Sequence, residues 1–292
     1  MQKQSLRHLA QLFIVLVLLF GLGVPVQPAS AIEPVPSTFV VNSSGDEPLS
    51  SAITCLPSEP CTLRAAIEMV NFIANPLGTL ITFSIPDNNL FKTTTIKIGS
   101  ALPKLTVTNI TIQGPNLLPS PFPDYALVLD GKDGDYPGLE IGANDCKIKS
   151  LTIQNFADYG IVVDGSGSTV SGTVISGNKI GDLSPSIPLT DERNFGGISL
   201  IKAENSIIGG NTAADRNIIS GNMGEGIYIQ GGGFNLVRGN YIGTNVSGTA
   251  ALPNDVGIYI NESSDNAIGG FAAEHRNIIS GNTMQGIYIR GK

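Results

Sequence analysis

Tryptophan is absent from this 292-residue sequence, which has only two histidines and three cysteines. Loss of an N-terminal leader would remove His8 and leave His275 alone, which argues against Ser-His-Asp and Cys-His catalysis. No histidines or cysteines have the spacing of a transition-metal site, so we expect no metal. Charged residues make up 14% of the chain and the formal net charge is −7. This balance argues against nucleic acid and anionic membranes as partners.

Long apolar runs are also absent, except at the N-terminus. Leu9–Val24 is almost wholly apolar, Lys3 and Arg7 precede it, and the small residues Ala29-Ser-Ala31 follow it. This pattern predicts a signal peptide over residues 1–31, cleaved after Ala31, and hence a secreted, extracellular or cell-surface protein. An uncleaved anchor is the alternative, which the short run disfavours. No other segment predicts a stable membrane span.

What the sequence does contain is internal repetition. The segment Ile207–Gly231 returns 60 residues later as Ala267–Gly291, with 16 of 25 residues identical. Such repetition predicts a stacked array in which each unit packs against a copy of itself. Residues shared by the repeats are therefore expected to be structural, and chemistry is expected where the repeat is broken.

The repeat unit has the pattern of short β-strands. Gly-Ile-Tyr-Ile and looser versions of it recur at intervals of 29 to 37 residues, starting at Gly160, Gly197, Gly226, Gly257 and Gly286. The apolar runs are short and bounded by Gly, Asn and Ser, which predicts three strands per turn and parallel pairing between turns. We therefore predict an all-β fold, a parallel β-helix. Corner asparagines are expected to adopt left-handed backbone and to bond the next coil, namely Asn178, Asn222, Asn240 and Asn282.

The N-terminal third differs from the repeats. Residues 32–53 predict a proline-rich leader and a first strand. Residues 54–100 predict a cap and the first coils, with one amphipathic helix in Cys61–Asn71 that begins at Thr62 and covers the first coil. Residues 101–292 are predicted to be the β-helix repeats.

The cysteines fit an oxidising compartment. Cys55 and Cys61 are six residues apart, which predicts a disulfide; a free pair is the alternative. Cys146 is left over and is expected to be a small buried apolar residue.

Several motifs resemble a known family. Cys61-Thr-Leu-Arg-Ala-Ala-Ile67 is similar to the Cys-Ser-Leu-Arg-Glu-Ala-Ile motif that names a family of secreted bacterial β-helix proteins, although Ala65 stands where that motif has Glu. Ile110-Thr-Ile-Gln-Gly-Pro115 resembles that family's early coils, and Gly239-Asn-Tyr-Ile-Gly-Thr244 resembles long β-helix arrays of bacterial surface proteins. The resemblance covers nearly all of residues 38–292 and implies secretion and a right-handed β-helix. Related arrays include adhesin-like proteins and carbohydrate-active enzymes, so it implies no single activity.

Acidic residues break the repeat in two connections. Asp191 and Glu192 lie in the connection 181–196, and Asp255 lies in the connection 244–256. The repeat spacing predicts that both emerge from one corner, two coils or roughly 10 Å apart. Paired carboxylates there would suit glycoside hydrolysis. Solvated loops are the competing interpretation, which the neighbouring prolines and charges favour.

Arg216 and Arg276 occupy the same repeat position, directly before Asn. β-helix lyases use basic residues beside a calcium-bound uronate, so calcium is expected only if the chain is a lyase. The interpretation that we favour is that each arginine braces a turn by binding carbonyl groups of a neighbouring coil. The oxygen-rich segment Asp130–Asp135 predicts turns and not a calcium loop.

Aromatic residues form one row. Tyr228, Tyr259 and Tyr288 are predicted to point outward from three successive coils, in steps of roughly 4.8 Å, with Ser199 and Val162 ending the row. Such a row could bind sugar rings. Mutual stacking that stiffens the coils is the alternative.

The leading prediction for function is a structural and binding module, adhesin-like, with a polysaccharide or cell-surface ligand and no cofactor. The alternative is a polysaccharide lyase or glycoside hydrolase that uses the two connections. The chain stops at Lys292 directly after a predicted strand, so we expect further coils or another chain to cover this end.

Overall fold

The computed structural model describes residues 37–50, 55, 59–75, 77–86, 93–115, 127–183 and 192–291. The chain divides into Met1–Val35 and Pro36–Lys292, and all described residues belong to the second unit. The predicted signal peptide and Asp191 lie outside the described residues. Within the described ranges, no helix is long and apolar enough to cross a membrane.

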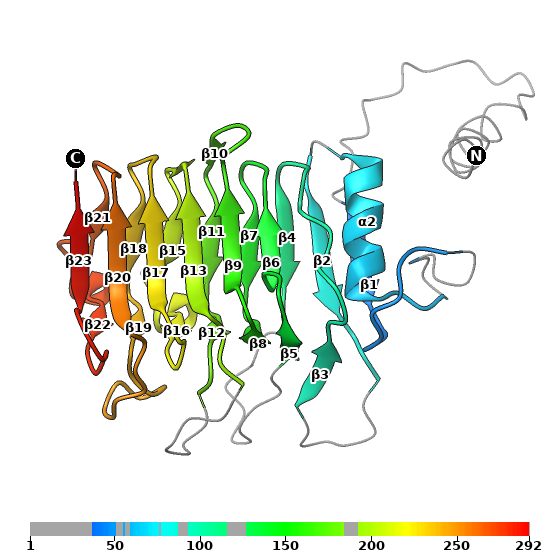
Figure 1. The fold of residues 1–292 in the computed structure, drawn as a ribbon. Helices are drawn as coiled ribbons and strands as arrows, with labels where there is room; N and C mark the ends of the chain where they lie inside the picture. The colour runs from blue at the N-terminus through cyan, green and yellow to red at the C-terminus, as the bar shows by residue number, and fades with distance from the viewer. Residues whose placement is uncertain are drawn as a thin grey trace, which may run out of the picture. The chain divides into compact units, whose positions relative to one another are not determined.

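Short strands stack in parallel into three sheets, to which successive turns of the chain each add one strand (Figure 1). Sheet A contains β1 (Ser37–Val41), β2 (Thr79–Phe83), β4 (Ile110–Gln113), β7 (Lys147–Lys149), β11 (Val174–Ser176), β15 (Ile207–Gly209), β18 (Leu236–Arg238) and β21 (Ala267–Ile268). Sheet B contains β3 (Thr94–Lys97), β5 (Leu127–Gly134), β8 (Thr152–Phe156), β12 (Lys179–Ile180), β16 (Ile218–Ile219), β19 (Tyr241–Ile242) and β22 (Ile278–Ile279). Sheet C contains β6 (Leu139–Ile141), β9 (Tyr159–Asp164), β13 (Gly196–Ile201), β17 (Glu225–Gln230), β20 (Val256–Asn261) and β23 (Ile287–Arg290). A corner pair is formed by β10 (Val170–Ser171) and β14 (Ala203–Glu204).

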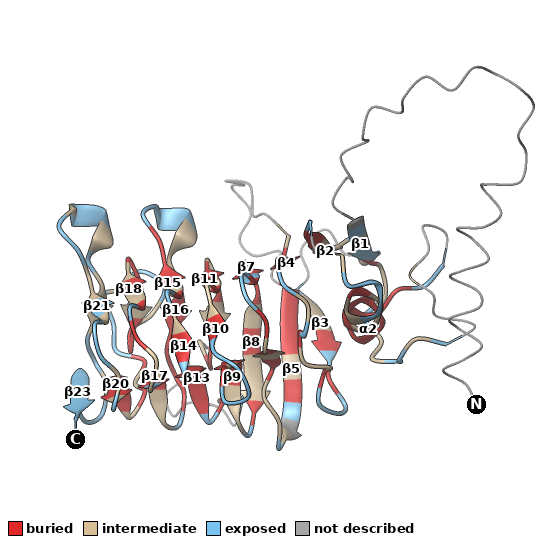
Figure 2. Cartoon of the chain, turned by 90° about the horizontal axis from the view of Figure 1, so that it is seen from above, coloured by how far each residue is buried: buried red, intermediate tan, exposed pale blue. Residues whose placement is uncertain are grey.

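Columns of isoleucine fill the interior of the coils. Ile198, Ile227 and Ile258 are register partners in sheet C, and all three are fully buried. Figure 2 shows buried segments along the strands and exposed segments at the corner loops. Because side chains alternate along a strand, the residue after each of these isoleucines points outward. The prediction of an all-β parallel β-helix is therefore confirmed.

One α-helix, α2 (Leu63–Ile73), occurs in the described part of the chain and covers the first coils. Thr62 caps it as predicted, because its hydroxyl accepts a hydrogen bond from the Ala65 N–H at 3.0 Å. Leu63, Ile67 and Val70 are buried in the same apolar core as the first strands. The helical cap of the predicted fold is thus present.

A disulfide fixes the start of this helix. Cys55 and Cys61 are bonded, which confirms the predicted pair. The Cys61 N–H donates to the Asn42 side chain at 2.7 Å, and the Cys61 carbonyl accepts from the Asn42 and Ser43 N–H groups. The bonded pair therefore lies directly beside the end of β1. Cys146 is free and buried, as expected.

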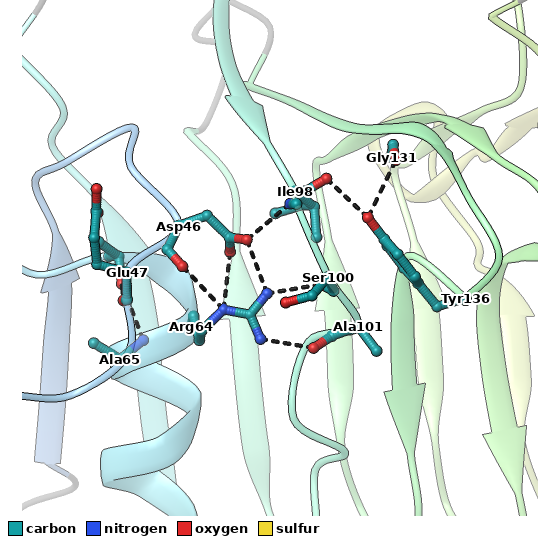
Figure 3. A network of polar contacts seen from close by, with 11 residues as sticks. Asp46, Glu47, Arg64, Ala65, Ile98, Ser100, Ala101, Gly131 and Tyr136 are labelled. Atoms are coloured by element: carbon teal, nitrogen blue, oxygen red, sulfur yellow. Dashed lines mark hydrogen bonds and ion pairs between the residues drawn. The ribbon is translucent and has the colours of Figure 1, made fainter.

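Arg64 connects α2 to a segment of the first coils (Figure 3). Its guanidinium donates to both carboxylate oxygens of Asp46, at 2.9 and 3.1 Å. It also donates to the carbonyl oxygens of Ser100 and Ala101, each at 2.6 Å. Asp46 in turn accepts from the Gly99 N–H at 2.8 Å. The arginine of the family-like motif is thus a structural clamp, with only 8% of its surface exposed.

Two rows of asparagine hold the corners on either side of sheet B. In both rows, each Nδ2 except the last donates to the Oδ1 of the asparagine one coil further on, at 2.8 to 3.2 Å. The first row is Asn178, Asn217, Asn240 and Asn277, and the second row is Asn194, Asn222, Asn254 and Asn282. The expected bond to the next coil is therefore confirmed. The expected left-handed asparagine is wrong, because the positive φ belongs to the preceding residue, at Gly177, Gly221, Gly239 and Gly281.

From residue 177 onward, long and short corners alternate along the coils. Between sheets A and B, residues 210–217 form a long loop that contains the 3-10 helix η1 (Ala213–Asp215), and residues 269–277 form another with η2 (Ala273–His275). The coil between them turns through only two residues, Gly239 and Asn240.

The alternation is reversed between sheets B and C. There the connections 181–195 and 243–255 are long, whereas residues 220–224 form a short corner between them. Three of the long loops, 210–217, 243–255 and 269–277, lie over the short corner of the preceding coil. There a glycine N–H donates to a loop carbonyl at 3.0 to 3.2 Å, in the pairs Gly177 with Asp215, Gly221 with Leu252 and Gly239 with His275. The structural unit is therefore a pair of coils.

Candidate functional site

The tyrosine row (Tyr228, Tyr259 and Tyr288) lies on the outer face of sheet C. The three residues are register partners in β17, β20 and β23, which confirms the predicted alignment. Ring centroids are 5.2 Å apart between Tyr228 and Tyr259, and 4.9 Å apart between Tyr259 and Tyr288. Each of three successive coils thus presents one phenol on the same face.

The rings of the tyrosine row stand partly on edge. Their planes are inclined to one another by 51° for the first pair and 31° for the second. Strands that are roughly 4.8 Å apart leave too little room for neighbouring rings to lie side by side in one plane. Mutual contact therefore occupies part of each ring face, and the row presents ring edges and hydroxyl groups more than flat faces.

Tyr159 extends the row beyond the point where the sequence predicted its end. Its ring is stacked on Tyr228, with centroids 6.3 Å apart, although β13 lies between β9 and β17. The ring crosses β13 at Gly196, where an added Cβ would lie 2.2 Å from a ring carbon. Ser199 and Val162 end the row of residues in register, as predicted, but Tyr159 stacks on that row from another position of β9.

Glu225 binds the far end of the Tyr159 side chain. The Tyr159 hydroxyl donates to the Glu225 carboxylate at 2.7 Å. Burial, followed by this hydrogen bond and the charge of Glu225, raises the pKa of Tyr159 well above its ordinary value. The hydroxyl therefore stays protonated and holds the carboxylate beside the row. The sequence analysis did not select Glu225. Its register partner in the next coil is Val256, so a charged residue at this position breaks the repeat and could have been noticed.

Exposed apolar side chains lie at the corner where the strands of sheet C begin. Phe195 packs edge-on against the Tyr159 ring at 5.7 Å between centroids, and 45% of its surface is exposed. Met223 and Met284 lie at the same corner and are 42% and 59% exposed. We call Phe195, Tyr159 and the tyrosine row together the aromatic strip. Phe195 and Tyr288 are exposed and the three rings between them are half-buried, so the strip reaches the surface along one sheet, as interaction surfaces do.

A polar column runs beside the tyrosine row. Gln230, Asn261 and Arg290 occupy the next outward positions in β17, β20 and β23. Asn261 donates to the Tyr228 hydroxyl at 3.3 Å. A hydrogen bond with Tyr259, followed by the charges of the phenol groups, raises the pKa of Arg290. The row is therefore flanked by side chains that can donate to and accept from a ligand.

Charges are paired toward the N-terminal end of the same face. Lys104 Nζ lies 3.0 Å from a carboxylate oxygen of Glu140 and 2.6 Å from one of Asp164. The hydrogen bond from Lys104, followed by one from Ser166, lowers the pKa of Asp164 to about 2. This cluster joins three coils and carries two negative charges against one positive charge.

The acidic residues predicted for catalysis lie at the corner between sheets B and C. Glu192 precedes Asn194 in the second asparagine row, and Asp255 follows Asn254 of that row two coils later. Both therefore emerge from one corner, as the repeat spacing predicted. The Glu192 carboxylate accepts a hydrogen bond from Gln154 at 3.0 Å.

The arginines lie at the other end of sheet B. Arg216 and Arg276 directly precede asparagines of the first row, Asn217 and Asn277. Arg216 Nε donates to the Gly239 carbonyl at 3.1 Å, and its guanidinium lies 4.1 Å from the ring centroid of Tyr241. Arg216 thus braces its corner, as the favoured interpretation predicted. Sheet B separates these arginines from Glu192 and Asp255, so the structure does not unite them in one site.

No group of three or more acidic, histidine or cysteine side chains is placed to hold a metal ion within the described ranges. Asp130, from the oxygen-rich segment, accepts hydrogen bonds from the Lys132 N–H and the Asn155 side chain, each at 2.9 Å. Both bonds lie at β5, whose register with β8 shifts between Asp130 and Gly134, so this part of the segment is an irregular strand and the prediction of turns is wrong.

Comparison with known proteins identifies the repeats. A family model described as a right-handed beta helix region matches residues 139–292. No curated protein and no solved structure matches the chain. The match covers more than half of the chain and includes every strand of sheet C. It agrees with the observed stack of parallel strands and supports the right-handed form of the β-helix.

Proposed function

The chain belongs to the right-handed β-helix family, and from this premise we propose that it is a secreted or cell-surface module that binds polysaccharide on the outer face of sheet C. The observation that carries the proposal is the aromatic strip, in which the ring centroids of neighbouring phenols lie 4.9 to 6.3 Å apart. Phenols combine apolar surface with a hydroxyl, and sugars likewise combine apolar ring faces with hydroxyl groups. The polar column of Gln230, Asn261 and Arg290 supplies further hydrogen-bonding groups.

Binding is favoured over catalysis by the placement of the charged candidates. Arg216 donates to a carbonyl and lies on a tyrosine ring, so its role at the corner is structural. Glu192 and Asp255 share one corner but stand two coils apart, with the short corner 220–224 between them. A hydrolase needs two carboxylates that flank one bond, whereas a binding face needs only repeated contacts.

Secretion is supported by independent features. Residues 1–31 have the charge, apolar run and small residues of a cleavable leader. The Cys55–Cys61 disulfide belongs to an oxidising compartment. Together with the family-like motif at Cys61–Ile67, these features support a ligand outside the cell.

The test is retention on immobilised polysaccharides. Protein produced from the full sequence would be applied to neutral, acidic and amine-bearing polymers, with and without calcium, and any released fragments analysed by mass spectrometry. We expect retention without fragments, and loss of retention in Tyr228→Ala and Tyr259→Ala. Phe271→Ala, an exposed aromatic residue outside sheet C, is the matched control and should bind normally.

Two results would contradict the proposal. Released fragments would identify a lyase or a glycoside hydrolase, according to whether the new ends are unsaturated or hydrated. Retention that is unchanged in both tyrosine variants would remove the aromatic strip as the binding face.

A further inference from the structure

Carboxylates gather where the aromatic strip begins. Glu225 accepts the hydrogen bond of Tyr159 at 2.7 Å. Asp158 accepts a hydrogen bond from the Tyr159 N–H, also at 2.7 Å. The Asp255 N–H donates to the Gly224 carbonyl, which places Asp255 one coil beyond Glu225 at the same corner. Three carboxyl groups therefore lie along this corner, next to the strands that carry Tyr159, Tyr228 and Tyr259.

From this arrangement, we propose that the aromatic strip selects a glycan whose sugar rings carry protonated amino groups. This inference rests on the proposed function and names the class of polysaccharide. A protonated amino group has three donors and no acceptor, so it is matched by carboxylate and phenol oxygens and not by amides alone. Exposed aromatic rings such as Phe195 add a favourable interaction with a cation.

The positive charges near the strip do not offset this preference. Arg290 lies at the opposite end, in β23, where its register partner is Asn261. Lys104, on the same face, lies within 3.0 Å of both Glu140 and Asp164. Arg193 adjoins Glu192, so this pair adds no net charge. The local balance is therefore negative, and a uronate polymer would meet repulsion where an amine polymer meets attraction.

The repeat of the coils favours a polymer over a single sugar. Strands are roughly 4.8 Å apart, so hydroxyl groups of the tyrosine row recur at that step along the axis. An extended β-linked glycan advances by about one ring over a similar distance. A glycan bound along the axis can thus present an equivalent sugar ring to each coil. Its amino groups would then lie beside the carboxylates of Asp158, Glu225 and Asp255.

The experiment compares oligomers of equal length by calorimetry, at a pH that keeps amino groups protonated. The probes are β-linked glucosamine, its N-acetylated form, galacturonate and oligolysine. We expect glucosamine to bind at least tenfold more tightly than its neutral N-acetylated form, and the advantage to shrink as salt rises.

Substitutions locate the effect. Glu225→Gln and Asp255→Asn should each weaken glucosamine binding by about fivefold to tenfold and leave binding of the N-acetylated oligomer unchanged. Glu204→Gln, on the corner strand β14, removes a carboxylate away from the strip and is the matched control. Thermal unfolding of each variant establishes that it is folded.

The outcomes separate this inference from the proposed function. Equal binding of the neutral and amine oligomers would overturn the inference and leave the binding face intact. Oligolysine bound as tightly as glucosamine would also overturn it, because the face would then recognise charge without a sugar. Absence of binding to every glycan would overturn both.

Discussion

The hydroxyl of Tyr159 donates a hydrogen bond to the carboxylate of Glu225 from two coils away, 66 residues earlier in the sequence. The ring can make this crossing because the coil between them has Gly196 beneath the ring. A side chain at that position would occupy the path of the ring. The continuity of the aromatic strip therefore depends on a residue that contributes no side chain of its own.

Gly196→Ala should break the strip. The added Cβ would lie 2.2 Å from a Tyr159 ring carbon, so the ring must leave its stack on Tyr228. We expect a loss of about 1–3 kcal/mol in the free energy of unfolding, as for other overpacking substitutions. Denaturant unfolding and the near-ultraviolet circular dichroism of tyrosine measure the two effects. Gly167→Ala is the control, since an added Cβ there meets nothing within 4 Å; equal behaviour of the two variants would contradict this account.

Asn222→Ala should be among the most damaging single changes in the repeats. Its Nδ2 donates to Asn254 at 2.8 Å and to the Ile180 carbonyl at 3.2 Å, while its Oδ1 accepts from Asn194 at 3.2 Å. Truncation removes three buried hydrogen bonds, each worth about 1 kcal/mol, so we expect a loss of about 3 kcal/mol in the free energy of unfolding.

The matched control for this change is Asn282→Ala, in the last coil of the same row. Asn282 is half-buried; it accepts hydrogen bonds from Asn254 and donates one, at 3.3 Å, to the Ile242 carbonyl. Its loss should cost clearly less when both variants are unfolded by denaturant. A larger effect at Asn282 than at Asn222 would show that the row does not act through buried hydrogen bonds.

Arg64→Lys should loosen the helical cap without disturbing distant coils. Lysine keeps the charge but cannot donate to Asp46 and to two carbonyl groups at once. We expect the cap to lose about 2–4 kcal/mol, since a buried ion pair with additional hydrogen bonds is broken. Hydrogen exchange should accelerate at the Gly99 amide, which donates to Asp46, and remain slow in β17. Uniform acceleration along the chain would contradict a local role, and Lys147→Ala on exposed β7 should change neither region.

Stability should fall in alkali because of Cys146. Burial raises the pKa of this thiol from 9.0 to about 11. Between these values the unfolded chain loses the proton and the folded chain keeps it, so the free energy of unfolding falls as pH rises, by about 1.4 kcal/mol per pH unit. The stabilisation is complete below pH 9. Denaturant unfolding of the protein and of Cys146→Ala should show a shallower decline in the variant; parallel curves would exclude this source.

The repeats could be predicted from sequence because one pattern recurs and each copy tests the others. Strands of two to six residues are normally difficult to assign, but alignment of Gly-Ile-Tyr-Ile between coils fixed their register before the structure did. The same argument located the tyrosine row. It failed for Tyr159, whose contact with Tyr228 is diagonal and crosses a coil through a gap that only three-dimensional packing creates.

Corner geometry shows a second limit of the sequence. Asparagine and glycine both tolerate left-handed backbone, so the pair Gly-Asn did not reveal which residue adopts it. The structure assigns it to the glycine, because the asparagine side chain must point inward to reach its neighbour in the next coil. Residue propensity therefore predicted the position of each corner, but not which of its two residues has the left-handed backbone.

The alternation of long and short corners restricts how coils can be added or removed. Deleting residues 207–266 removes one coil of each kind, and we expect a folded protein by circular dichroism and size exclusion. Deleting residues 207–235 removes one coil and sets the long connections 181–195 and 243–255 against each other, so we expect aggregation or a much lower melting temperature. Such an array can lengthen by duplication of a gene segment of two coils but not of one. Identity at 16 of 25 positions across an interval of 60 residues is the trace that such a duplication leaves.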